Sequence, residues 1–252
     1  MRLPNIAGNT LSSAVRQPIF YVLIGVGAAL ILVSYPMTLF TFSEHNTDKM
    51  IRDMGVATVA LSGLLAAIFS ASTSIAEEID RRTALTVLCK PVSRMEFILG
   101  KYVGIIASGL IVVVVLTLVL FLSYVAVRKQ IAPWFFQAAV FSFLQVAVLS
   151  AVSVAVSIRF PMAANVVVCL ILYVVGNLAG GLQGLAGQSS ATARIILRCL
   201  FLSLPNLSNF SFAHSASAVS SLYFLACVVY AGLYSALVLG AAVLLFERRE
   251  LM

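Results

Sequence analysis

Six stretches of the chain carry no charged residue, and each is long enough to cross a membrane. They cover residues 18–43, 54–76, 102–127, 130–158, 160–193 and 199–246. About 20 apolar residues, rising 1.5 Å each, span the roughly 30 Å hydrocarbon core of a bilayer. Backbone groups in lipid must bond within their own segment, which favours helices. The pattern predicts six membrane-spanning helices, at residues 18–40, 54–74, 102–125, 134–156, 162–181 and 222–246.

The composition supports a membrane protein. Hydrophobic residues make up 62% of the 252 positions and charged residues 10%, whereas soluble domains have about 45–50% and about 25%. The net charge of +7 comes from Lys and Arg between the spans, where they orient a membrane protein, so we expect no nucleic-acid partner. The sequence predicts an all-α integral membrane protein with a single transmembrane domain, residues 1–252.

The chain before the first predicted span is only moderately apolar. Arg2 and Arg16 flank Ile6, Leu11 and Val15. This pattern is typical of a short interfacial helix lying on the membrane, here over residues 1–17. A disordered tail is the alternative.

The distribution of Lys and Arg predicts the orientation. With the N-terminus inside, ten of the sixteen basic residues fall in inside segments, and basic residues favour the cytoplasmic side. We therefore expect a multi-pass protein of the inner (cytoplasmic) membrane with both termini in the cytoplasm. The loop over residues 182–221 is then outside. Arg194 and Arg198 lie four residues apart on one helix face, which predicts a helix at, or re-entering, the outer leaflet until Pro205 ends it.

Several uncharged polar residues lie inside the predicted spans, and none of these spans contains a Lys, Arg, Asp or Glu. In membranes such side chains usually join helices by hydrogen bonds, and contact with a transported molecule is the second interpretation. The candidates are Ser62, Ser70, Gln145, Asn165 and Asn177. Gly55, Ser62, Gly63 and Ala66 also give the second span a small-residue face, typical of close helix contact or of a seam between two copies.

The segment of residues 77–96, between the second and third spans, combines charges of both signs. Good helix formers run from Glu77 to Leu88, and Pro91 prevents the helix from continuing. Ser93 and Glu96 form a capping box, which makes Ser93 the predicted N-cap of the next helix. Helix, break and helix predict an ordered cytoplasmic elbow, suited to docking a partner. A solvated loop that only sets topology is the alternative.

This elbow resembles the cytoplasmic signature of ABC type-2 permeases, the membrane subunits of ATP-driven exporters. The resemblance rests on Glu77-Glu78-x-x-x-Arg82-Thr83 followed by Lys90-Pro91-Val92-Ser93-Arg94-x-Glu96-Phe97-x-x-Gly100-Lys101. The segment Leu204-Pro205-Asn206-Leu207-Ser208-Asn209-Phe210 and the ending Phe246-Glu247-Arg248-Arg249-Glu250-Leu251 are also similar to that family. Together these segments extend the resemblance over nearly the whole chain.

The resemblance implies that the elbow carries a coupling helix that fits a groove on a cytoplasmic ATPase. The implied coupling residues are Glu77, Glu78, Arg81, Arg82, Thr83, Leu88, Pro91, Ser93 and Arg94. The implied partners are two ABC ATPase subunits, a second permease copy or homologue, membrane lipid, and a periplasmic or extracellular accessory protein.

The chain lacks the G-x-x-x-x-G-K-[ST] phosphate loop. Gly100-Lys101 has no glycine five residues earlier, and Tyr102 follows it. We therefore expect ATP and Mg²⁺ to be bound by the partner ATPase, with no cofactor, metal or catalytic residue in this chain.

Two other functions fit parts of the sequence. A membrane anchor or sensor that transports nothing has the same span pattern, and fold alone does not fix function. Glu77-Glu78-x-x-x-Arg82 and Phe210-x-x-x-His214 also match motifs of CAAX-type membrane proteases. The further histidine motif of those proteases is absent, and the predicted topology places the glutamates and histidines on opposite sides of the membrane.

Overall fold

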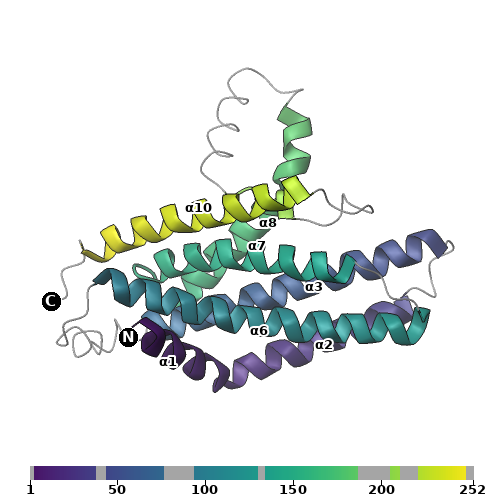
Figure 1. Cartoon of the computed structure of the whole chain (residues 1–252), viewed down its shortest axis with the longest axis horizontal. Helices are drawn as coiled ribbons and strands as arrows, with labels where there is room; N and C mark the ends of the chain where they lie inside the picture. Colours follow the sequence, from purple (N-terminus) through teal and green to yellow (C-terminus); the bar gives the residue numbers. More distant parts are fainter. Residues whose placement is uncertain are drawn as a thin grey trace.

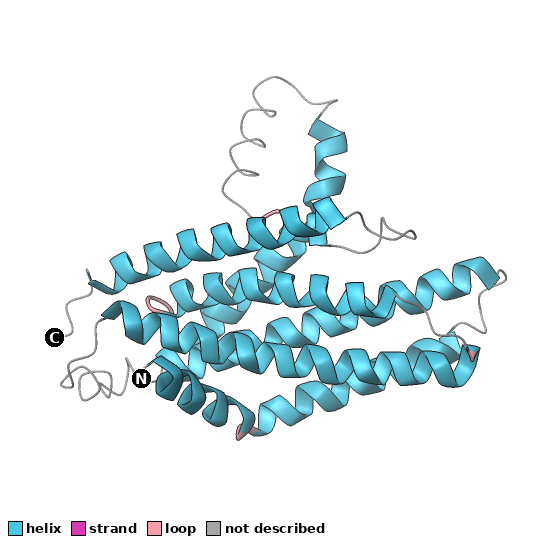
Figure 2. Cartoon of the chain, in the orientation of Figure 1, coloured by secondary structure: helices cyan, strands magenta, loops and turns pink. Residues whose placement is uncertain are grey.

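The computed structural model describes residues 3–37, 44–76, 94–129, 134–186, 205–210 and 221–247. All regular secondary structure in these ranges is helical (Figure 2), as predicted. The elements are α1 (Leu3–Val15), α2 (Pro18–Met37), α3 (Glu44–Ala71), the π-helical segment η2 (Ser72–Ala76), α6 (Arg94–Arg128), α7 (Trp134–Ser157), α8 (Met162–Ala186), the 3₁₀ helix η3 (Leu207–Phe210) and α10 (Ser221–Glu247).

The long helices form a bundle around α6. This helix contacts α1, α2, α3, α7 and α10, and Figure 1 shows α2, α3, α6, α7 and α10 running along the long axis of the molecule. We call the end where η2 finishes at Ala76 and α6 begins at Arg94 the elbow end. The N-terminal helix α1 and the last turn of α10 lie at this same end (Figure 1).

Five of the six predicted spans are helices long and apolar enough to cross a membrane. They are Pro18–Pro36, Lys49–Ile75, Met95–Ala126, Trp134–Ser157 and Ser221–Phe246. The predicted fifth span coincides with α8, whose apolar portion Met162–Leu178 is shorter. The helical membrane fold is confirmed, and the count of six spans stays a prediction.

Two candidate spans extend over charged residues that the predicted spans left out. The helix α3 begins at Glu44 and α6 at Arg94, well before the predicted spans at residues 54 and 102. Arg52, Asp53 and Lys101 therefore lie within candidate spans. Lysine, arginine and glutamate are good helix formers, so charged residues need not end a helix. Arg52 pairs with Asp53, and Lys101 bonds to a backbone carbonyl.

The outer helices expose many large apolar side chains, which is unfavourable in water. Leu222, Leu233 and Leu237 of α10 are 77%, 63% and 74% exposed, and α2 exposes Leu30, Leu32 and several valines. Most of α3 and α7, by contrast, is buried. An apolar rim around a packed centre is stable where lipid is the solvent.

The small-residue face of α3 packs against α6 of the same chain. A Cβ added at Gly63 would lie 2.8 Å from Val113 Cγ2, and one at Gly55 would lie 2.5 Å from Leu120 Cδ1. Close helix contact is confirmed at these glycines, and it lies within one chain rather than between copies.

The expected N-terminal helix is present as α1, and it packs on the base of α6. Thr10 and Ala14 of α1 are buried, and a Cβ at Gly104 would lie 2.7 Å from the carbonyl oxygen of Ala7. Its position on the membrane surface stays a prediction.

Candidate functional site

Most of the predicted coupling residues lie outside the described part of the chain. These are Glu77, Glu78, Arg81, Arg82, Thr83, Leu88, Pro91 and Ser93. The helix α6 begins at Arg94, immediately after the predicted N-cap. The structure thus describes the two arms that hold the elbow, which are η2 on one side and the first turns of α6 on the other.

The arm before the elbow leaves regular α-helix at Ser72. Hydroxyl groups here bond to the backbone: Thr73 Oγ1 donates to the carbonyl of Phe69 at 2.9 Å, and Ser74 Oγ donates to the carbonyl of Ser70. Side-chain bonds of this kind compete with the helix ladder, and single π turns within helices are frequent at functional sites.

Lys101 joins the two arms. Its side chain is only 3% exposed, and Nζ donates a hydrogen bond to the carbonyl oxygen of Ser74. Nζ also lies 5.1 Å from the ring centroid of Phe97, a cation–π contact. A buried ammonium is costly without such partners. The bond connects the last turn before the elbow to α6 about two turns after it.

Gln17 connects the same segment to the N-terminal helices. It lies in the turn between α1 and α2, and its Nε2 donates to Thr73 Oγ1 at 2.8 Å. This bond joins η2 to the turn between α1 and α2.

Asn165 connects η2 to the two helices on its other side. It is fully buried on α8, and its Nδ2 donates to Ser72 Oγ at 2.8 Å and to Ser153 Oγ of α7 at 2.9 Å. Its Oδ1 accepts from Cys169 Sγ at 3.4 Å.

These contacts define one connected group, which we call the π hub. It consists of Gln17, Ser72, Thr73, Ser74, Lys101, Ser153 and Asn165. An interhelical hydrogen bond in a membrane contributes about 0.6 kcal/mol on average, so the hub fixes geometry more than it adds stability. The sequence singled out Asn165, but it missed Gln17 and the role of Lys101, whose position directly after the elbow motif was the available signal.

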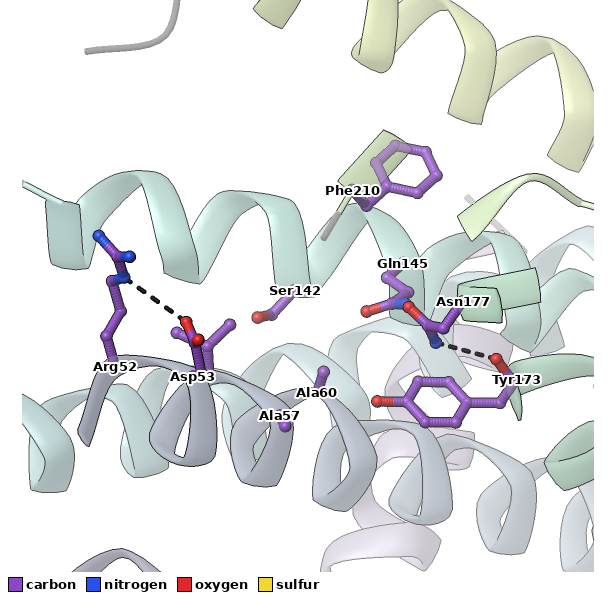
Figure 3. Close-up of a pocket in the computed structure, with 10 residues that line it drawn as sticks. Arg52, Asp53, Ala57, Ala60, Ser142, Gln145, Tyr173, Asn177 and Phe210 are labelled. Atoms are coloured by element: carbon purple, nitrogen blue, oxygen red, sulfur yellow. Dashed lines mark hydrogen bonds and ion pairs between the residues drawn. The ribbon is translucent and has the colours of Figure 1, made fainter. Parts of the chain in front are cut away.

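A pocket of about 130 Å³ lies between α3, α7, α8 and η3 (Figure 3). Its lining contains Arg52, Asp53, Val56, Ala57, Ala60, Ser142, Gln145, Tyr173, Asn177 and Phe210. Two predicted polar residues meet there, since Gln145 Nε2 donates to Asn177 Oδ1 at 3.0 Å. Asn177 Nδ2 donates in turn to the carbonyl of Tyr173 at 2.9 Å.

The two remaining predicted residues of the spans lie apart from the pocket. Ser62 is buried against α2, because a Cβ at Gly27 would lie 2.9 Å from Ser62 Oγ. Ser70 is buried just before η2, and its Oγ has no hydrogen-bond partner among the described residues. Ser62 thus lies in a close contact between α2 and α3, and its predicted role in hydrogen bonding between helices stays a prediction.

The residues of the protease motif are only partly described. Phe210 is 2% exposed in an apolar cluster, where its ring lies 6.0 Å from that of Tyr230. His214 and the two glutamates are outside the described ranges. In its observed position Phe210 serves packing of η3 against the bundle.

Comparison with known proteins gives one family. The model of the ABC-2 family transporter proteins matches residues 19–251. A comparison with curated proteins gives no match.

Proposed function

This chain belongs to the ABC-2 transporter family, and from that premise we propose that it is the permease subunit of an ATP-driven exporter in the inner membrane. As a multi-pass permease it is the membrane component of such a machine. Two cytoplasmic ABC ATPase subunits bind and hydrolyse ATP with Mg²⁺. A second permease copy or homologue completes the translocation unit within the lipid, and a periplasmic or extracellular accessory protein joins it outside.

In this proposal the elbow end faces the cytoplasm. The N-terminal helix α1 and the end of α10 lie together at this end (Figure 1), which supports placing both termini on the cytoplasmic side. The elbow, residues 77–96, then projects toward the ATPases.

In this proposal the π hub transmits movement of the elbow to the membrane helices. Closure of the ATPase dimer pushes the elbow, and Lys101 makes the two arms move together because it bonds to Ser74 across them. Gln17 and Asn165 pass the displacement to the α1–α2 turn and to α7 and α8. Packed helices with alternative arrangements can convert such small shifts into inward- and outward-facing states.

The observation that carries this function is the hydrogen-bonded hub at the root of the elbow, in a chain of the ABC-2 family. Alanine at Glu78 or Arg82 should lower the permease-stimulated ATPase rate of the reconstituted complex by about tenfold, since each removes a docking charge. The readouts are the ATPase rate and copurification of the ATPase subunit.

The matched control is Lys49→Ala. Lys49 is exposed on α3, at the end of the bundle away from the elbow, so removing its charge should change neither readout. Unchanged ATPase stimulation in both elbow variants would overturn the coupling role and leave the anchor interpretation.

A further inference from the structure

One wall of the pocket is a face of α3 that carries small side chains at Ala57 and Ala60. Its residues on α3 are Arg52, Asp53, Val56, Ala57 and Ala60, whose spacing keeps them on a single helix face. Ala57 and Ala60 line the pocket together with Ser142, Gln145 and Tyr173. Figure 3 shows the Tyr173 hydroxyl directed toward Ala60 and the Ser142 hydroxyl directed toward the Asp53 side of the pocket.

Ser142 leaves a buried hydroxyl group unsatisfied in this space. The residue is 2% exposed, and Oγ has no hydrogen-bond partner among the described residues. Other buried serines on α7 donate to their own helix: Ser150 to the carbonyl of Ala147 at 2.8 Å and Ser157 to that of Val154 at 2.9 Å. A buried hydroxyl without a partner keeps its desolvation cost uncompensated. The Ser142 hydroxyl is thus available to a bound group.

Gln145 adds an acceptor beside it. Its Nε2 is engaged with Asn177, and Figure 3 shows its oxygen on the opposite side, toward Ser142. A group that both donates and accepts hydrogen bonds can satisfy the Gln145 oxygen and the Ser142 hydroxyl together.

The charges of the pocket compensate each other. Arg52 Nε lies 3.6 Å from Asp53 Oδ1, and the rest of the lining is uncharged. A lining with no net charge disfavours a net-charged ligand, because burial of an unpaired ion is costly. The volume of about 130 Å³ is well above the roughly 10–15 Å³ that one water needs.

We propose that this pocket binds a small uncharged hydroxyl-bearing group of about the size of glycerol. The group is either the head of a neutral lipid or a free polyol, since both present the same hydroxyl chemistry. Val56 and Phe210 in the lining offer apolar contact to an attached chain. Binding is a property of this chain alone and does not depend on the proposed coupling to an ATPase.

The test uses the full-length permease in phosphatidylcholine nanodiscs without ATPase. A radiolabelled monodecanoylglycerol with a photoreactive acyl chain is the probe, and cross-linked peptides are mapped by mass spectrometry. We expect saturable labelling of α3, α7 or α8, displaced by unlabelled monodecanoylglycerol at concentrations at least tenfold lower than by decyl sulfate or decyltrimethylammonium.

Competition with free glycerol distinguishes a lipid head group from a soluble polyol. Displacement by glycerol as effective as by monodecanoylglycerol assigns a soluble polyol, and displacement only by the acylated compound assigns a lipid head. Labelling that does not saturate, or that a charged amphiphile displaces equally well, overturns the proposal.

Two variants locate the site. Ala57→Leu fills the pocket from an exposed position of α3 and should reduce labelling at least tenfold, whereas Ser142→Ala should weaken it about threefold to tenfold. Ala236→Leu, also exposed but on α10, is the control and should label like the wild type. Wild-type labelling of both pocket variants would show that the probe binds elsewhere.

Discussion

The π hub and the pocket both use α7 and α8, but their buried polar groups differ: in the described part of the chain, those of the hub are hydrogen-bonded, and one of the pocket is not. In the hub, Asn165 donates to two hydroxyls and Lys101 donates to a backbone carbonyl. In the pocket, the Ser142 hydroxyl is buried without a partner among the described residues.

The difference indicates two uses of polarity inside a membrane protein. Side chains that satisfy one another fix the relative positions of helices and can transmit a displacement. A side chain that remains unsatisfied has a cost that a bound group can remove. The comparison therefore predicts that hub variants affect coupling and stability, whereas pocket variants affect binding.

The largest effect is expected from Lys101→Met. Methionine preserves most of the volume of lysine but removes the donor to the Ser74 carbonyl, which costs stability. Without the bond to Ser74, the two arms of the elbow are no longer tied. We expect the permease-stimulated ATPase rate of the complex to fall about tenfold or more, and the thermal unfolding midpoint of the permease to fall as expected for a loss of about 1–3 kcal/mol.

Lys49→Met is the control for this variant, because Lys49 is an exposed lysine on α3, far from the elbow end. It should leave both measurements at wild-type values. Full stimulation in Lys101→Met would show that the hub only holds the helices together.

The spans could be predicted from the sequence because lipid imposes a long apolar run on any crossing helix. Segments 18–40 and 222–246 were predicted within a few residues of α2 and α10. The start of α6 at Arg94 follows the predicted N-cap Ser93, because capping residues mark a helix start that hydropathy does not. The start of α3 at Glu44 lies well before the predicted span, because hydropathy marks only the apolar part of a helix.

The candidate site was only partly predictable. Asn165, Gln145 and Asn177 stood out as polar residues in apolar runs, but hydropathy could not tell that Asn165 bonds across three helices while Gln145 borders a pocket. That distinction depends on which side chains face each other across helices distant in sequence. The elbow residues were chosen by resemblance, and their roles stay predictions.

An intermediate effect is expected from two asparagines of α8. Asn165→Ala removes donors to Ser72 and Ser153 and leaves buried polar groups unsatisfied, which should cost about 1–3 kcal/mol. Asn177→Ala removes a partly buried bond at the pocket and should cost about 0.6 kcal/mol. Unfolding of each variant in mixed detergent micelles measures the difference. Equal losses would contradict the distinction between hub and pocket.

The smallest effect is expected from Ser142→Ala, compared with Ser153→Ala on the same helix. Both serines are at most 2% exposed. Ser153 accepts a bond from Asn165, so its removal should cost about 1 kcal/mol. Ser142 has no such bond in the described structure, so alanine removes an uncompensated hydroxyl, and the unfolding free energy should stay within about 0.5 kcal/mol or rise. If Ser142→Ala lowered the unfolding free energy as much as Ser153→Ala, the Ser142 hydroxyl would already stabilise the fold. The pocket would then offer no unsatisfied hydroxyl to a ligand.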